Sequence, residues 1–214
     1  MHGDNSSNML QFQIDRPCER NVVARQCVEV YANRCRRQTK MAQGGPCETA
    51  FGSDRSMRKH SYFASRFREG WPEPAEMERY FLAPPGKRWF FETRNDSGGL
   101  TAEGVDGTGH FGSTDRRRVT VYLDMWGHPE LGVQLTWRKQ GGGHNETFYS
   151  TGDLARLGEH VRSLHDTLLP VGLFIPYEDA WEAVKEFIAT EGERPKCIAW
   201  IEEDALPAGT FPAP

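Results

Sequence analysis

Residues 148–201 read FYSTGDLARLGEHVRSLHDTLLPVGLFIPYEDAWEAVKEFIATEGERPKCIAWI, and this stretch decides the fold class. Its first three residues end a strand. The residues after Asp153 predict a helix that this side chain caps, with an apolar face of Leu154, Leu157, Val161 and Leu164. A short apolar run over 171–175 ends at Pro176. The spacing beyond it predicts a second helix, whose apolar face is Ala180, Trp181, Val184, Phe187 and Ile188. Residues 197–201 then form a buried strand.

Further strands precede this stretch. Alternating apolar and polar residues predict strands over 119–126 and 132–137, and residues 146–150 follow a triple-glycine turn. The aromatic run 88–93 predicts one strand more, whereas residues 95–112 contain six glycines and predict a long loop. Strands followed by helices indicate an α+β fold. We expect a mostly antiparallel sheet, a meander of about four strands and then α-β-α-β, with two helices packed on one face. The predicted aromatic core is Trp89, Phe91, Tyr122, Trp137, Trp181, Phe187 and Trp200.

Composition changes sharply along the 214 residues. All six tryptophans lie at or after Trp71, and residues 1–60 show no sustained hydrophobic period. We therefore expect a domain over 71–214 and a disordered tail over 1–70. An alternative is that translation starts at Met57 or Met77 and that the residues before this start are not part of the protein.

Charge is distributed unevenly. Residues 1–60 carry ten Lys or Arg against six Asp or Glu, and the remainder carries 16 against 24. An acidic domain argues against nucleic acid as its ligand and favours a basic protein partner. With 37% hydrophobic residues and a mean hydropathy of -0.66, the chain has no apolar run long enough to span a bilayer. The start lacks the pattern of a signal peptide, so we expect a cytoplasmic protein.

Four cysteines fall within a short part of the tail: Cys18, Cys27, Cys35 and Cys47. No Cys-x-x-Cys pair occurs among them, although structural zinc sites usually take their ligands in close pairs. Disulfides would require an oxidising compartment. Unpaired thiols are favoured over either alternative. The fifth cysteine, Cys197, is expected to pack as a small hydrophobe in its strand.

Histidines offer the main argument for catalysis. His110, His128 and His144 lie in the predicted loop and turns, where they could hold a metal if they met at one rim. Ordinary loop polarity explains each of them equally. The chain has no Gly-x-Ser-x-Gly elbow and no phosphate-binding loop. We therefore expect no enzyme, no cofactor, no metal and no small-molecule substrate.

The C-terminal part also resembles a known family. Four short motifs, in this order along the chain, form the basis of the resemblance: Tyr149-Ser150-x-Gly152-Asp153, Pro170-Val171-Gly172, Ala183-x-x-Glu186-Phe187-Ile188 and Arg194-Pro195-x-x-Ile198-x-Trp200. This order resembles the type-one family of bacterial polymorphic-toxin immunity proteins, over about residues 117–203. The resemblance implies a small intracellular inhibitor, encoded beside a toxin that is often a nuclease or a deaminase.

On this resemblance the expected partner is a cognate toxin domain with a basic active-site groove, which an acidic surface would block. Charge and turn geometry give the candidate contact residues. Those on the turn after the 119–126 strand are Asp124, Trp126, His128 and Glu130; weaker candidates are Asp153, Glu202, Glu203 and Asp204. Two alternatives stay open: a metal-dependent enzyme that uses the loop histidines, and a regulator that keeps the fold without a toxin partner.

Overall fold

The computed structural model describes residues 57–63, 66–88, 95–106 and 117–212. All of them belong to one compact unit, residues 50–214. The remaining residues, among them the four tail cysteines, His110 and the 89–93 part of the predicted aromatic strand, lie outside the described residues. No helix in the described part of the chain is long and apolar enough to cross a membrane.

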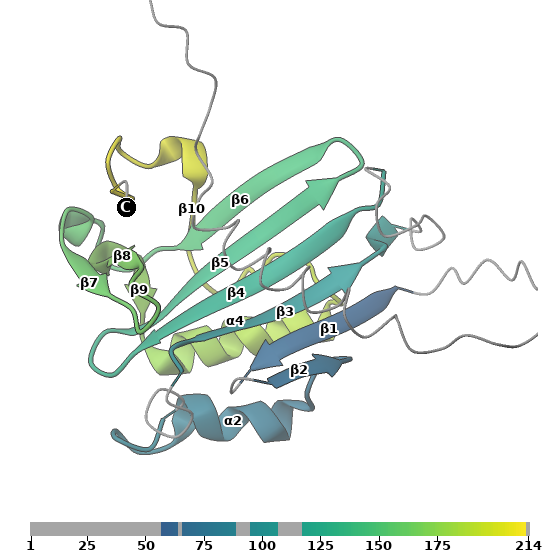
Figure 1. Ribbon diagram of the computed structural model, residues 1–214, viewed down its shortest axis with the longest axis horizontal. Coiled ribbons are helices and arrows are strands. Elements are labelled where there is room, and N and C mark those ends of the chain that lie inside the picture. Colours follow the sequence, from purple (N-terminus) through teal and green to yellow (C-terminus); the bar gives the residue numbers. More distant parts are fainter. Residues whose placement is uncertain (1–56, 64–65, 89–94, 107–116, 213–214) are drawn as a thin grey trace, which may run out of the picture. The chain divides into compact units, whose positions relative to one another are not determined.

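An antiparallel sheet of eight strands is the framework of the unit (Figure 1). Its order is β10-β6-β5-β4-β3-β1-β2, and β9 pairs with β5 near the start of that strand. The strands are β1 (Arg58–Phe63), β2 (Arg66–Glu69), β3 (Ser97–Glu103), β4 (Thr120–His128), β5 (Gly132–Gly141), β6 (His144–Ser150), β9 (Phe174–Ile175) and β10 (Trp200–Glu202). The mostly antiparallel α+β fold is therefore confirmed, and so are the strands around 119–126, 132–137 and 146–150.

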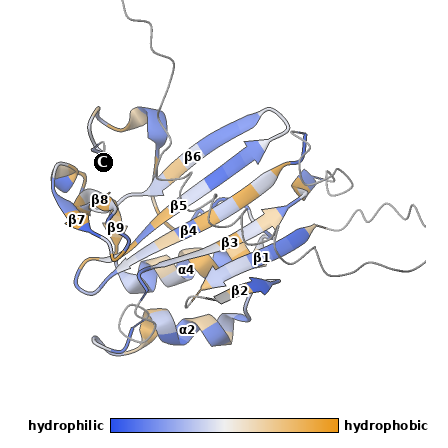
Figure 2. Ribbon diagram, viewed as in Figure 1, coloured by the Kyte–Doolittle hydropathy of each residue, from blue (hydrophilic) through white to orange (hydrophobic). Residues whose placement is uncertain are grey.

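Two α-helices, α2 (Pro74–Leu82) and α4 (Tyr177–Ala189), lie on the same face of the sheet (Figure 1). The helix predicted beyond Pro176 is thus confirmed. Figure 2 shows apolar and polar residues interspersed along α4 and β4, as expected for elements with one buried side. The core between helices and sheet includes Trp181 and Phe187 of α4, Phe81 of α2, and Leu123 and Leu135 of the central strands.

The remaining short elements connect β6 to α4. They are the 3₁₀ turns η2 (Leu154–Arg156) and η3 (Val171–Leu173), and the hairpin of β7 (His160–Arg162) and β8 (Leu168–Pro170). A last turn, η4 (Glu203–Ala205), follows β10.

The helix expected after Asp153 does not form. Asp153 does cap, accepting a hydrogen bond from the Ala155 N–H, but it caps only the single turn η2. The chain then enters the β7–β8 hairpin. The single turn η2 packs closely on η3 instead, since a Cβ on Gly172 would lie 2.6 Å from the Asp153 carbonyl oxygen and 2.9 Å from the Leu157 nitrogen. Leu154 and Leu164, expected on the apolar face, are exposed.

Three other expectations need correction. Strand β3 occupies residues 97–103 of the expected glycine-rich loop; its Gly99 lies opposite Tyr62 and Asp124 of the neighbouring strands. Strands β1 and β2 belong to the sheet, so the domain begins earlier than residue 71. The buried strand expected at 197–201 is the half-buried β10 at 200–202, and Cys197 is exposed, its N–H bonded to the Glu186 carboxylate.

Gly132, which opens β5, gives a test of this packing. Its φ is +102°, and an added Cβ would lie 1.9 Å from the Ile175 carbonyl oxygen. We expect Gly132→Ala to lower the free energy of unfolding by about 2 kcal/mol or more, measured by urea denaturation. Gly143→Ala is the control: its φ is +93° but the added Cβ meets nothing within 4 Å, so it costs only about 1 kcal/mol. Equal losses for both variants would contradict the close approach.

Candidate partner-binding face

The sheet has a second face, opposite α2 and α4, which we call the helix-free face. Side chains alternate along a strand, so Val121, Leu123 and Met125 of β4 enter the core while Tyr122 and Asp124 point to the other side. Other residues on the helix-free face, placed by the cross-strand register, are Thr101, Trp126, Thr136, Arg138 and Tyr149. The face is therefore polar and aromatic, in contrast to the apolar face under the helices.

An ion pair lies at the centre of this face. Nε of Arg138 on β5 donates to Oδ2 of Asp124 on β4 at 3.1 Å, and Nη2 donates to the same oxygen. The guanidinium also stacks on the Tyr122 ring, 4.6 Å from its centroid. The Arg138 side chain is only 7% exposed and that of Asp124 29%, so each charge depends on the other for compensation.

Tyr149 on β6 extends this group toward the edge of the sheet. Its ring packs on Phe211, with centroids 5.0 Å apart, and its hydroxyl makes a long hydrogen bond of 3.5 Å to Glu203. Burial, together with Glu203, raises the pKa of Tyr149 well above its ordinary value. The phenol therefore stays protonated and remains a hydrogen-bond donor. We call Tyr122, Asp124, Arg138, Tyr149 and Glu203 the polar array.

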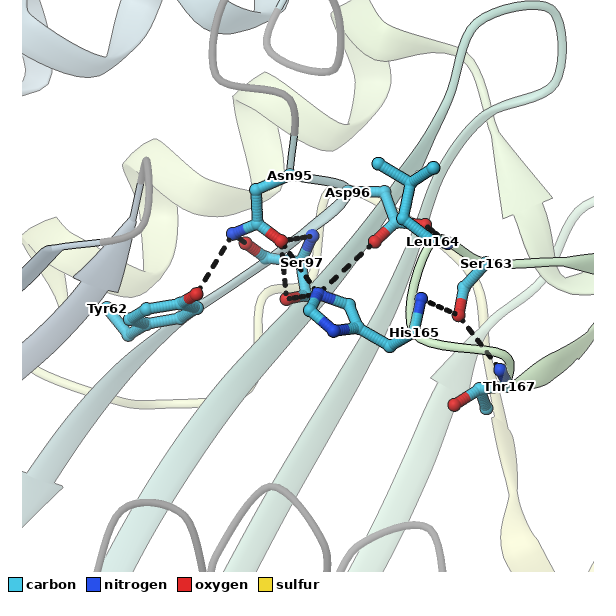
Figure 3. Close-up of polar contacts among 8 residues, drawn as sticks. All are labelled: Tyr62, Asn95, Asp96, Ser97, Ser163, Leu164, His165 and Thr167. Atoms are coloured by element: carbon cyan, nitrogen blue, oxygen red, sulfur yellow. Dashed lines mark hydrogen bonds and ion pairs between the residues drawn. The ribbon is translucent and has the colours of Figure 1, made fainter. Parts of the chain in front are cut away.

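A second polar group closes the other end of the face, where the turn between β7 and β8 meets the start of β3 (Figure 3). His165 packs edge-on against Trp126, with ring centroids 5.9 Å apart. Its Nε2 lies 2.8 Å from Asn95 Oδ1, 3.3 Å from Ser97 Oγ and 3.7 Å from Asp96 Oδ1. Because the amide oxygen only accepts, this nitrogen carries the proton.

Serine, histidine and aspartate meet here, but their geometry does not suit nucleophilic catalysis. A catalytic histidine accepts from the serine with one ring nitrogen and donates to the carboxylate with the other. Ser97, Asp96 and Asn95 all lie on the Nε2 side of His165. The arrangement instead joins the β7–β8 turn to the sheet.

The residues expected at the β4–β5 turn have mainly local roles. Nδ1 of His128 accepts from the N–H groups of Glu130 and Leu131 at 3.2 and 3.3 Å, and its carbonyl accepts from the Tyr177 hydroxyl. Burial lowers the pKa of His128, which favours the neutral imidazole that these bonds require. Glu130 is exposed on the turn.

The candidate residues do not form one patch. Asp124 and Glu203 belong to the polar array, and Glu202 and Asp204 flank Glu203 as exposed side chains at the β10 edge. Trp126 is only 8% exposed and supports His165, so it is no exposed anchor. Asp153 caps η2 elsewhere.

Arg138, Tyr122 and Tyr149 were missed by the sequence analysis. Tyr122 was assigned to the core, but it lies out of phase with the apolar residues of β4, and Arg138 is likewise out of phase with Val133, Leu135 and Trp137 of β5. The same alternation that predicts the strands could have placed these side chains on the polar face.

The histidine cluster weighed as an alternative does not bring His128 and His144 together. His128 ends β4 at one end of the meander, whereas His144 begins β6 at the other, and the ten residues of β5 separate these ends by about 30 Å. Within the described residues no three His, Cys, Asp or Glu side chains are grouped so that they could hold a metal ion.

The fold and this face define a two-sided antiparallel α+β domain with a polar, aromatic sheet surface. Residues 112–202 match the model of the family described as Immunity protein Imm1. The match confirms the resemblance seen in the sequence, covers less than half of the chain and supports an immunity-protein role. It includes β4 to β10, and with them the strand residues of the polar array, but not β1–β3 or α2. No curated protein and no solved structure matches the chain.

The central ion pair predicts a non-additive response to substitution. Asp124→Ala leaves the Arg138 guanidinium buried without its carboxylate, so the free energy of unfolding falls by about 2 kcal/mol, less than for a fully buried pair because Asp124 is 29% exposed. Asp124→Leu combined with Arg138→Met recovers most of this loss. As a control, Arg68→Ala breaks the exposed pair with Glu76 and costs under about 1 kcal/mol. Additive losses in urea denaturation would contradict the coupling.

Asp96 predicts a pH dependence of stability. Burial raises the pKa of Asp96, against smaller opposing effects of the Leu164 N–H and His165. The folded protein thus holds this proton more tightly than the unfolded chain does. The carboxylate therefore destabilises the fold increasingly as the pH rises above about 4, until it is fully ionised in the folded state.

Asp96→Asn removes this charge and keeps an oxygen that can accept from Leu164 N–H. We expect the variant to have a higher midpoint of thermal unfolding than the wild type at about pH 7, and the difference to shrink toward about pH 4. A lower midpoint at neutral pH would show that the ionised carboxylate stabilises the isolated protein.

Proposed function

We propose that this protein is an immunity protein that binds a cognate bacterial toxin domain, of the nuclease or deaminase class, and neutralises it by covering the active site. The observation that carries the proposal is the helix-free face, whose polar array draws its strand residues from the segment that matches the immunity family. Tyr122 and Tyr149 are partly exposed in this array, and tyrosine is enriched among the residues that dominate protein–protein binding.

The charges at the rim support a basic partner. Glu202, Glu203 and Asp204 are exposed next to Tyr149 at the edge of the helix-free face. A toxin that acts on nucleic acid needs Lys and Arg around its active site to attract phosphate. An acidic rim guides such a groove to the face through charge complementarity and competes with the substrate for the same cations.

On this proposal the inhibition is steric and electrostatic, and the protein itself catalyses no reaction. Its binding partner is a protein, with no role for a nucleic acid, a membrane or a small-molecule substrate. The site of action is the cytoplasm, where the toxin would meet its nucleic-acid or nucleotide target.

Co-expression tests the proposal directly. The toxin domain encoded next to this gene is expressed in a sensitive host with and without the full chain, and survival is counted. We expect the chain to restore growth and to form a stable complex with a catalytically inactive form of the same domain. Growth arrest that the chain does not relieve would contradict the immunity role.

A charge reversal at the rim tests whether the toxin domain binds at this face or elsewhere on the surface. Glu203→Arg should slow association with the toxin domain by about tenfold at low salt, because it replaces attraction by repulsion, and the difference should shrink at high salt. Glu193→Arg is the matched control, an exposed glutamate four residues beyond the end of α4. Stopped-flow or biolayer kinetics measure both, and equal effects of the two reversals would place the interface elsewhere.

A further inference from the structure

The turn between β7 and β8, residues 163–167, carries two features that folding alone does not explain. Leu164 is 56% exposed, more than any other large apolar side chain among the described residues. Its N–H donates at 2.6 Å to Oδ2 of Asp96, whose side chain is 4% exposed. In the described part of the chain no group donates a hydrogen bond to Oδ1 of Asp96. An exposed apolar side chain and a buried, half-satisfied carboxylate therefore occur at the same place.

The turn is held in one conformation by Ser163 (Figure 3). Its hydroxyl oxygen accepts from the N–H groups of His165 and Thr167 at 3.1 and 3.0 Å, and its own N–H donates to the Thr167 carbonyl. Asp166 adopts a left-handed φ of 66° within this turn. The turn thus holds Leu164 exposed in the free protein, and binding a partner costs little conformational entropy at this position.

His165 does not supply the missing hydrogen bond to Oδ1 of Asp96. Its Nε2 proton is directed at Asn95 Oδ1, 2.8 Å away, whereas Oδ1 of Asp96 lies at 3.7 Å, beyond hydrogen-bond distance. The imidazole is half exposed and packs on Trp126 outside the hydrophobic core, so it can move away from Asp96 without disturbing the core. A buried carboxylate oxygen without a donor is costly, and a cationic donor compensates it best.

We propose that Asp96 and Leu164 form a recognition point for the cognate toxin, at which a Lys or Arg side chain of the toxin displaces His165 and pairs with Asp96 while apolar atoms cover Leu164. This inference rests on the proposed function and specifies one contact within it. The recognition point adjoins Trp126 at the end of the helix-free face, so a partner on that face reaches it without a second interface. The cost of burying the unpaired carboxylate in the free protein is then recovered in the complex.

The test uses the full chain and the inactive toxin domain encoded next to its gene. Asp96→Asn should weaken binding about tenfold or more while its thermal midpoint stays at or above that of the wild type, because a charge-assisted bond is lost from the complex only. Leu164→Ala should weaken binding several-fold. Leu154→Ala, a leucine of similar exposure on η2, is the control and should leave binding unchanged.

A double-mutant cycle then identifies the partner of Asp96. Each Lys and Arg of the toxin domain is changed to Ala and combined with Asp96→Asn, and one of them should show coupling while the others are additive. This inference would be overturned, and the immunity role left intact, if Asp96→Asn bound the toxin domain as tightly as the wild type. The same holds if no Lys or Arg of the toxin domain showed coupling to Asp96. Absence of wild-type binding would overturn both.

Discussion

The register between β4 and β5 is the constraint on which the other features depend. The two strands face each other over nine residue pairs, from Thr120 opposite Gln140 to His128 opposite Gly132. A slip of one residue would turn every side chain of one strand to the other face of the sheet. It would carry Arg138 into the core beneath α4 and move Leu135 to the polar side. The core and the polar array are thus two results of a single alignment, which the close approach of Gly132 to Ile175 helps to fix.

Much of the fold follows from local patterns in the sequence. Strands β4 to β6 and helix α4 have clear periods and turn residues, and each forms where those patterns predict it. The helix expected after Asp153 does not form; η2 packs closely on the backbone of Gly172 there, and leucine spacing carries no information about such a tertiary contact. Strand β3 was missed because its glycines are typical of a loop. In the sheet, Gly99 lies between Tyr62 and Asp124, where neighbouring strands supply the side chains that it lacks.

The candidate site was less predictable, because its residues come from distant parts of the chain. Charge alone identified Asp124 and Glu203, yet it could not reveal that Arg138 neutralises the first of them. Trp126 was predicted as an exposed anchor beside a turn, but in the structure His165 of the β7–β8 turn packs against it and helps to bury it. The contact between Asp96 and Leu164 joins residues 68 positions apart, and no periodicity signals such a pairing.

The core under α4 reaches beyond the segment that matches the immunity family. Trp181 stacks on Phe81 of α2, and Phe187 packs on Trp71, and both partners precede residue 112. Strand β3, which pairs along β4, also lies outside the match. In this chain the core of the shared segment is therefore completed by residues that precede it. A relative that shares only that segment has to cover the same two rings with residues of its own, so whatever precedes β4 in such a protein has to supply the closure of the core that Trp71 and Phe81 supply here.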